Sequence, residues 1–328
     1  MRLELFRFLA GLLLVLPLYG HAEVRVIRDV TLISPERETP LRGAHVLIRD
    51  GRIAQVSTQP IDAPDAEVID GSGRYLVPGL IDSHVHLDHA TGLKRRYTTD
   101  FDRLYRDFQR QQPRSFLYFG YTTVIENNGD PDIDRSFDAA PLHPHREHCG
   151  TLVLSDDFLA TDFDSDEDFR AAYPNFLHDR HRTPTLPEGI DPAEHTPAAT
   201  IARIAATGAR CVKLYYEEAL WWPGDEHPPF GLPSLPILRE VVAAAHARGL
   251  TVLMHGNAPA AHRMGLEAGI DVMAHGLWDW AGATGGYAEI PDDVLVTADA
   301  VARSSMKQQP TWMAAAGMTS LFEPDSLS

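Results

Sequence analysis

Two patterns of apolar and polar positions divide this chain. Residues 23–77 hold short runs in which apolar and polar residues alternate, namely Val24–Ile33, Ala44–Asp50 and Arg52–Ser57. A two-residue period is typical of a β-strand with one buried face, and Asp50-Gly51 between two of the runs favours a tight hairpin. We therefore predict a small antiparallel sheet, arranged like a β-sandwich, for residues 23–77.

From residue 78 to residue 328, apolar runs alternate with stretches of helical period, which is typical of a parallel α/β fold. The predicted strands are Gly79–Ser83, Tyr121–Glu126, Thr151–Leu154, Arg210–Tyr215, Leu250–Met254, Asp271–Ala274 and Lys307–Trp312. The predicted helices are Asp100–Gln111, Pro197–Thr207, Pro233–Arg248 and Ala258–Ala268. We therefore expect residues 78–328 to form a TIM-type (β/α)8 barrel that lacks its eighth strand.

Two polar, proline-rich stretches interrupt the barrel pattern at residues 155–197 and 217–232. Loops of this length within a compact fold are usually functional or disordered. We expect both to shape a substrate pocket, with Trp221, Trp222 and Phe230 available for apolar contacts.

The first 22 residues have the features of a secretory signal peptide. Arg2 and Arg7 flank the start of an apolar run at residues 8–18, and small residues precede the expected cleavage point near Ala22. The run is shorter than the about 20 apolar residues that span a bilayer. We expect an exported protein, periplasmic or secreted, that meets the membrane only during export.

Composition narrows the choice of partners. With 29 basic and 46 acidic residues, the chain carries a net charge of −17, which argues against binding to nucleic acid or to an anionic membrane. The sequence leaves the oligomeric state open, with a homo-oligomer among the options. Cys149 and Cys211 could pair in an oxidising compartment, but Cys211 lies in an apolar run, so we expect two buried free thiols.

The most informative motif is His84-Val85-His86, which ends the apolar run that starts at Gly79. Residues two apart on a strand point to the same side, so both imidazoles can face one metal ion. For this motif alone, two histidines in a polar loop are the alternative interpretation.

Three later strands carry further candidate ligands. Lys213 lies within an apolar strand, where an unpaired lysine is costly and tends to lose its proton. A salt bridge to Glu126 or Glu217 is the structural alternative. His255 and His275 each end a strand just before a glycine. Because a barrel gathers the carboxyl ends of its strands on one face, these positions together predict a metal site.

This pattern resembles that of a known protein family. The amidohydrolase superfamily has His-x-His on one strand, a lysine on a later strand and a histidine on each of the next two. The lead-in Gly73–His86 is specific to this group, and the resemblance extends from residue 24 to about residue 316. The lysine makes the chain similar to the branch that contains prolidases and imidazolonepropionase.

The resemblance implies a set of metal ligands. His84 and His86 would hold one divalent ion, and His255 and His275 would hold a second. Lys213, carbamylated by carbon dioxide, would bridge the two ions. Zinc suits imidazole and oxygen ligands. Lys213, His255 and His275 would also be catalytic.

The reaction implied is hydrolysis of a carbon–nitrogen bond in a small-molecule amide, peptide or cyclic amide. Two ions about 3.5–4 Å apart lower the pKa of a bridging water and polarise the scissile carbonyl. The residues expected to face the substrate are Tyr215, Tyr216 and Glu217. The candidates to orient the ligating histidines are Asp88, Glu126 and Asp279.

The chain departs from the family in one respect. The strand-8 aspartate, which the family uses as a metal ligand and proton shuttle, is not apparent, and we expect a chain truncated at its C-terminus. Two alternatives therefore stay open. One is a mononuclear, deaminase-like enzyme, against which Lys213 counts. The other is a catalytically impaired fragment or binding protein.

Overall fold

The computed structural model describes residues 24–90, 93, 98–163, 165–182, 186, 188–218, 230–278 and 290–311. The chain forms two compact units, the first ending at Pro78 and the second starting at Gly79. The predicted signal peptide, Trp221, Trp222, Asp279 and the chain after Thr311 lie outside the described residues. In the described ranges, no helix has the length and apolar character needed to cross a membrane.

The first unit is a five-stranded sheet. Its strands are β1 (Val24–Leu32), β2 (Leu41–Arg49), β3 (Arg52–Ser57), β4 (Glu67–Asp70) and β5 (Tyr75–Leu76). β2 pairs antiparallel with both β1 and β3, whereas β4 and β5 run parallel to β1. The sheet is therefore mixed. The prediction of an antiparallel sheet is wrong for β4 and β5, because no local pattern marks the connection that takes the chain across β1.

Two turns in this unit depend on particular residues. Asp50 and Gly51 join β2 to β3 with φ angles of 50° and 71°, the positive values that a type I′ hairpin turn needs. The predicted hairpin is confirmed. Gly71 follows β4, and a Cβ there would lie 2.7 Å from the carbonyl oxygen of Arg28. The close approach of this turn to β1 therefore needs glycine.

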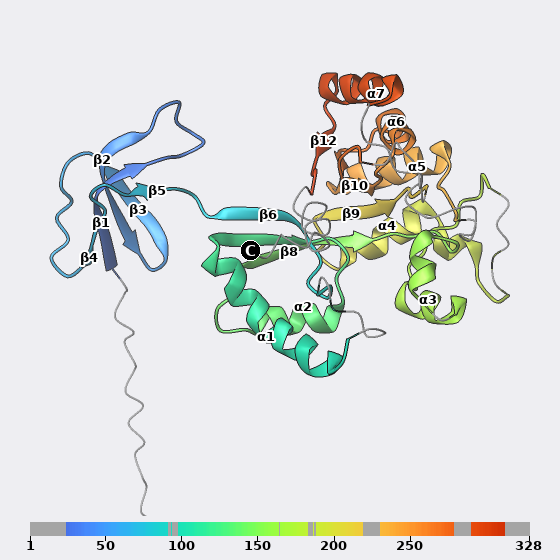
Figure 1. The fold of residues 1–328 in the computed structure, drawn as a ribbon, viewed down its shortest axis with the longest axis horizontal. Helices are drawn as coiled ribbons and strands as arrows, with labels where there is room; N and C mark the ends of the chain where they lie inside the picture. The colour runs from blue at the N-terminus through green and yellow to red at the C-terminus, as the bar shows by residue number, and fades with distance from the viewer. Residues whose placement is uncertain are drawn as a thin grey trace, which may run out of the picture. The chain divides into compact units, whose positions relative to one another are not determined.

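The second unit contains a parallel sheet of seven strands in sequence order. The strands are β6 (Leu80–Val85), β7 (Tyr121–Glu126), β8 (His145–Thr151), β9 (Cys211–Tyr215), β10 (Thr251–His255), β11 (Val272–Met273) and β12 (Lys307–Gln308). The sheet curls into part of a barrel with helices on its outside (Figure 1). This arrangement confirms the α/β class and is consistent with a TIM-type barrel. The lack of an eighth strand stays a prediction.

The helices connect these strands. They are α1 (Phe101–Tyr118), α2 (Pro131–Asp138), α3 (Asp166–Ala172), α4 (Pro197–Ala206), α5 (Leu235–His246), α6 (Pro259–Ala268) and α7 (Asp292–Arg303), with 3₁₀ turns η1 (Phe158–Asp162) and η2 (Pro192–His195). The helices α2, α3 and α7 are not among the predicted helices. The start of α2 is nevertheless marked, since the Asp130 side chain caps two backbone N–H groups and Pro131 follows it.

β8 begins at His145, well before its predicted start. Its first residues are polar and are paired with charged neighbours. Arg146 contacts Asp134 at 3.0 Å, and Glu147 contacts Arg210 at 3.1 Å. Paired polar residues at the amino end of a central strand hide it from a search for apolar runs.

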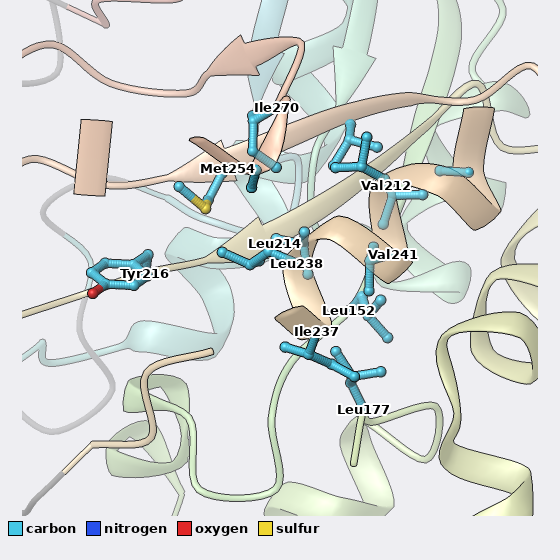
Figure 2. Close-up of a cluster of buried hydrophobic side chains, with 14 of the residues drawn as sticks. Leu152, Leu177, Val212, Leu214, Tyr216, Ile237, Leu238, Val241, Met254 and Ile270 are labelled. Atoms are coloured by element: carbon cyan, nitrogen blue, oxygen red, sulfur yellow. The ribbon is translucent and has the colours of Figure 1, made fainter. Parts of the chain in front are cut away.

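The two faces of β9 have different surroundings in the second unit. Val212 and Leu214 belong to one apolar cluster with Ile237 and Val241 of α5 (Figure 2). Alternate residues of a strand face opposite sides, so Lys213 points away from this cluster into the barrel. Each buried large apolar side chain contributes about 1.5–3 kcal/mol, which anchors β9 and thereby the direction of Lys213.

Cys149 and Cys211 form a disulfide between β8 and β9. The prediction of two free thiols is therefore wrong. The parallel register pairs Cys149 directly with Cys211, and their Cα atoms are 4.3 Å apart. Neighbouring strands bring the sulfurs together although 62 residues separate them in sequence.

Candidate metal centre

The side chains that the sequence singles out meet at the carboxyl ends of β6, β9, β10 and β11. His84 Nε2 lies 3.3 Å from His86 Nε2 and 3.4 Å from Lys213 Nζ. The ring centroids of His255 and His275 are 4.6 Å apart, and those of His84 and His275 are 5.1 Å apart. All five predicted ligands therefore lie in one cluster.

His84 and His86 each have a partner at the ring nitrogen that faces away from the cluster. His84 Nδ1 lies 3.1 Å from Gln309 Oε1, which only accepts, so the ring donates from Nδ1 and keeps its lone pair on Nε2. His86 Nδ1 lies 3.8 Å from Glu126 Oε1. This 3.8 Å contact is too long for a hydrogen bond. Both Nε2 atoms face the centre of the cluster, and His84 has the hydrogen-bonded outer partner that is typical of histidines in metal sites.

His255 and His275 are oriented in the same way. His255 Nε2 donates to Glu217 Oε2 at 2.7 Å, which leaves Nδ1 as the lone-pair atom. His275 Nδ1 shares a hydrogen bond of 2.8 Å with Thr311 Oγ1, a hydroxyl that can donate or accept, so this contact fixes the direction of the ring and not its tautomer. Thr311 has a φ of 48°, a left-handed conformation that is rare for a β-branched residue. Backbone strain of this kind collects at functional sites.

Burial keeps these imidazoles neutral near pH 7. It lowers the pKa of His84 to about 2 and the pKa of His86 to about 3, and the charge of nearby Lys213 acts in the same direction. Burial is also the main cause of the lowered pKa values of His255 and His275. A neutral imidazole offers the lone pair that a metal ion requires.

Lys213 is the unusual member of the cluster. Its side chain is 1% exposed, and burial lowers its pKa to about 7. Its one hydrogen-bond contact in the described part of the chain is to His84 Nε2, and the charge of Glu126 raises its pKa against the effect of burial, so a weak electrostatic contact with Glu126 stays in place. At neutral pH a large share of the molecules therefore carries the free amine, which is the form that reacts with carbon dioxide.

The donor set fits a metal centre on one condition. Among the described residues, no group of three or more His, Cys, Asp or Glu side chains is arranged to hold a metal ion. The imidazoles converge in pairs, and the remaining group between them is the Lys213 amine. Two imidazoles are an incomplete set for zinc, which takes four ligands. An anionic oxygen on Lys213 would supply a third donor for each pair, and catalytic zinc sites have three protein ligands with the fourth position open to water.

The three residues expected to face the substrate lie in different surroundings. Tyr215 is buried with its ring 5.7 Å from Lys213 Nζ, and its hydroxyl has no hydrogen-bond partner among the residues described. Tyr216 lies in the apolar cluster on the other side of the strand (Figure 2). Glu217 bonds to His255 and to Asn257.

Two of the candidates to orient the histidines lie in the described part of the chain. Glu126 is fully buried and accepts hydrogen bonds from the backbone N–H groups of Leu87 and Asn128. Burial raises its pKa to about 7, and its Oε1 lies 3.8 Å from His86 Nδ1. The carboxylate of Asp88 bonds to none of the described histidines, although burial raises its pKa as well.

An aromatic wall borders the cluster. The ring of Phe158 stacks on His255 at 5.2 Å and contacts Phe230 at 6.2 Å. Phe230 also lines a cavity of about 270 Å³, together with Ser155, Asp156, Asp157, Ala160, Thr161 and Asp166. The region predicted as a loop at 155–197 thus brings a pocket close to the cluster.

Gln309 and Thr311 are not among the residues predicted from the sequence. Both follow β12, the last strand described. Their position at a strand end is the one signal that could have marked them, since barrels place functional side chains there.

No protein-family model matches the chain, but comparisons with known proteins find similar sequences and similar structures. The chain is 32% identical over 101 residues to an L-hydantoinase of Paenarthrobacter aurescens, covering 31% of this chain and 19% of the hydantoinase. It is 37% identical over 65 residues to an adenine deaminase of Ruegeria pomeroyi, covering 19% of this chain and 11% of the deaminase. The matched parts thus span less than a third of either relative.

Solved structures share the fold over most of the chain. A prolidase in complex with N-methylphosphonate-L-proline has a TM-score of 0.61 at 18% identity, covering 93% of this chain and 71% of the prolidase. A solved amidohydrolase has a TM-score of 0.60 at 24% identity, with the same coverage. The chain is therefore similar over short stretches to a hydantoinase and a deaminase, and it shares the fold of a solved amidohydrolase and a solved prolidase.

Proposed function

We propose that the protein is a hydrolase that cleaves carbon–nitrogen bonds with two divalent metal ions bridged by carbamylated Lys213. The observation that carries the proposal is the buried Lys213 amine, 3.4 Å from His84 Nε2 and without an ion pair among the described residues. In this proposal His84 and His86 hold one ion, and His255 and His275 hold the other.

Lys213 becomes a ligand by reaction with carbon dioxide. The nitrogen lone pair attacks the carbon of carbon dioxide, an N–C bond forms, and the electron pair of one C=O π bond moves onto its oxygen. The nitrogen then releases one proton to water. The product is a carbamate with one negative charge shared by two oxygens. A buried group that repels metal ions is thereby converted into one that attracts them. Zinc is the ion that suits the resulting set of nitrogen and oxygen donors.

The bound ions would polarise the scissile carbonyl and lower the pKa of a water molecule. The residues of the chain position the substrate. The buried Tyr215 ring lies 5.7 Å from Lys213 Nζ and would border the carbamate. Phe158 provides an apolar surface beside His255. We propose a small amide, peptide or cyclic amide as the substrate, which agrees with the hydantoinase and prolidase among the similar proteins.

Metal content tests this proposal. The chain from residue 23 onward is produced with zinc and bicarbonate, and the metal per chain is measured for the wild type, Lys213→Ala and Lys307→Ala. Lys307 is exposed on β12 and serves as the matched control. We expect about two ions in the wild type and in Lys307→Ala. A Lys213→Ala chain that keeps both ions contradicts the bridging role.

A mononuclear deaminase-like enzyme is the second candidate, favoured by the match to an adenine deaminase. One ion per chain in the wild type, together with ammonia release from an aminated heterocycle, would select it. Two ions without turnover of any amide would instead select the third alternative, a catalytically impaired binding protein.

We also propose that the protein is exported and cleaved near Ala22. The Cys149–Cys211 disulfide supports export, because disulfides persist in oxidising compartments and are rare in the cytosol. Cell fractionation with mass spectrometry of the purified chain tests this. A cytosolic product that retains residues 1–22 contradicts it.

A further inference from the structure

Gln309 links the two outermost strands of the seven-stranded sheet. Its backbone N–H donates to the Met273 carbonyl oxygen of β11 at 2.9 Å. Its side-chain Nε2 donates to the Ser83 carbonyl oxygen of β6 at 2.8 Å, and its Oε1 lies 3.1 Å from His84 Nδ1. One residue after β12 therefore reaches across to β6, although 225 positions separate it from His84.

The two ends of the Gln309 amide are not interchangeable. The Ser83 carbonyl oxygen only accepts hydrogen bonds, so the amide nitrogen must face it. The amide oxygen then faces His84, and the ring must present N–H at Nδ1. The His84 lone pair is consequently on Nε2, the atom that faces His86 Nε2 and Lys213 Nζ.

We propose that Gln309 is a positioning residue that fixes the tautomer and direction of His84 for the metal centre. This inference rests on the proposed function, since it assigns Gln309 a role at the same site. The same short segment carries Thr311, which bonds to His275 Nδ1. Residues 309–311 therefore support one histidine from each of the two proposed metal pairs.

Metal affinity tests the role of Gln309. Zinc dissociation constants are measured by chelator competition for the wild type, Gln309→Leu, Gln309→Glu and Gln308→Leu. Gln308 is exposed on β12 and is the matched control. Gln309→Leu should bind zinc about 10–100-fold more weakly, as for other outer partners of metal-bound histidines. Gln309→Glu keeps an acceptor for His84 and should lose less, and Gln308→Leu should bind zinc as the wild type does.

A double-mutant cycle separates positioning from general stability. In a His84→Ala background, Gln309→Leu should cause no further loss of zinc affinity, because its target is gone. An equal loss in both backgrounds would mean that Gln309 acts only by holding β12 against β6, and would overturn the inference. Wild-type affinity in Gln309→Leu would overturn it as well.

The tautomer of His84 provides a readout without metal. Nitrogen NMR of the metal-free, ¹⁵N-histidine-labelled chain should show His84 protonated at Nδ1 in the wild type and not fixed there in Gln309→Leu. Protonation at Nε2 in the wild type would overturn the inference. A wild type that binds no zinc would overturn the proposed function instead. The His84 tautomer would then be the test of whether Gln309 positions His84.

Discussion

Glu217 Oε2 accepts a hydrogen bond of 2.7 Å from His255 Nε2, and this contact turns the other nitrogen of the ring toward His275 and the rest of the cluster. Glu217 is 5% exposed and lies two residues after the end of β9. A carboxylate that accepts a hydrogen bond from the outer N–H group makes the imidazole a stronger ligand. Lys213 and the support for His255 therefore come from one segment of chain.

Removing the Glu217 carboxylate should weaken metal binding. Glu217→Ala should lose about 10–100-fold in zinc affinity, and Glu217→Gln, which keeps an acceptor, should lose less. Chelator competition measures both. Glu240→Gln removes an ion pair with Arg180 elsewhere on the molecule and is the control. Equal affinities for Glu217→Ala and wild type would show that His255 is not a ligand.

The disulfide should contribute strongly to stability. It closes a loop between Cys149 and Cys211 that are 62 positions apart, and such a crosslink lowers the entropy of the unfolded chain. Urea unfolding of the Cys149→Ala/Cys211→Ala double variant should show a loss of about 2–4 kcal/mol relative to the oxidised wild type. An unchanged unfolding free energy would mean that the bond does not form in solution.

Gly150 should be required where β8 packs on α4. A Cβ at this position would lie 2.3 Å from Ile204 Cγ2. Gly150→Ala should therefore lower the unfolding free energy by about 1–3 kcal/mol, the usual effect of overpacking. Ile204→Ala makes room for the new methyl group, so the double variant should lose less than the sum of the two single losses. Additive losses would contradict this packing.

The neutral histidines should make the metal-free chain sensitive to acid. The pKa of His84 is about 2 in the folded chain and near 6.5 when unfolded, so its contribution to stability is present above pH 6.5 and is lost as the pH falls below it. Each such group adds about 1.4 kcal/mol per pH unit to the slope of unfolding free energy. His84→Gln should show a shallower slope than the wild type between pH 6 and pH 4, measured by urea unfolding. Parallel slopes would place His84 in solvent.

The site was predictable where the signal is local. His84 and Lys213 lie on strands with apolar neighbours, and His86 directly follows the first of these strands. Barrels gather strand ends, so sequence alone indicated the convergence of the three residues. The outer partners gave no such signal, because Gln309 and His84 are 225 positions apart and meet only through the curl of the sheet.

The fold was likewise predictable only where the sequence pattern is local. β7 and β9 are apolar runs and were found nearly to the residue, whereas the polar start of β8 concealed it. Pairing between strands distant in sequence was also hidden. The disulfide and the parallel pairing of β4 with β1 both depend on it.

The carbamate on Lys213 is the central claim, and carbon NMR tests it most directly. The chain is loaded with zinc in the presence of ¹³C-bicarbonate, and excess label is removed. We predict one protein-bound carbamate resonance in the wild type and in Lys307→Ala, and none in Lys213→Ala. A wild-type chain that holds two zinc ions without this resonance would contradict the account.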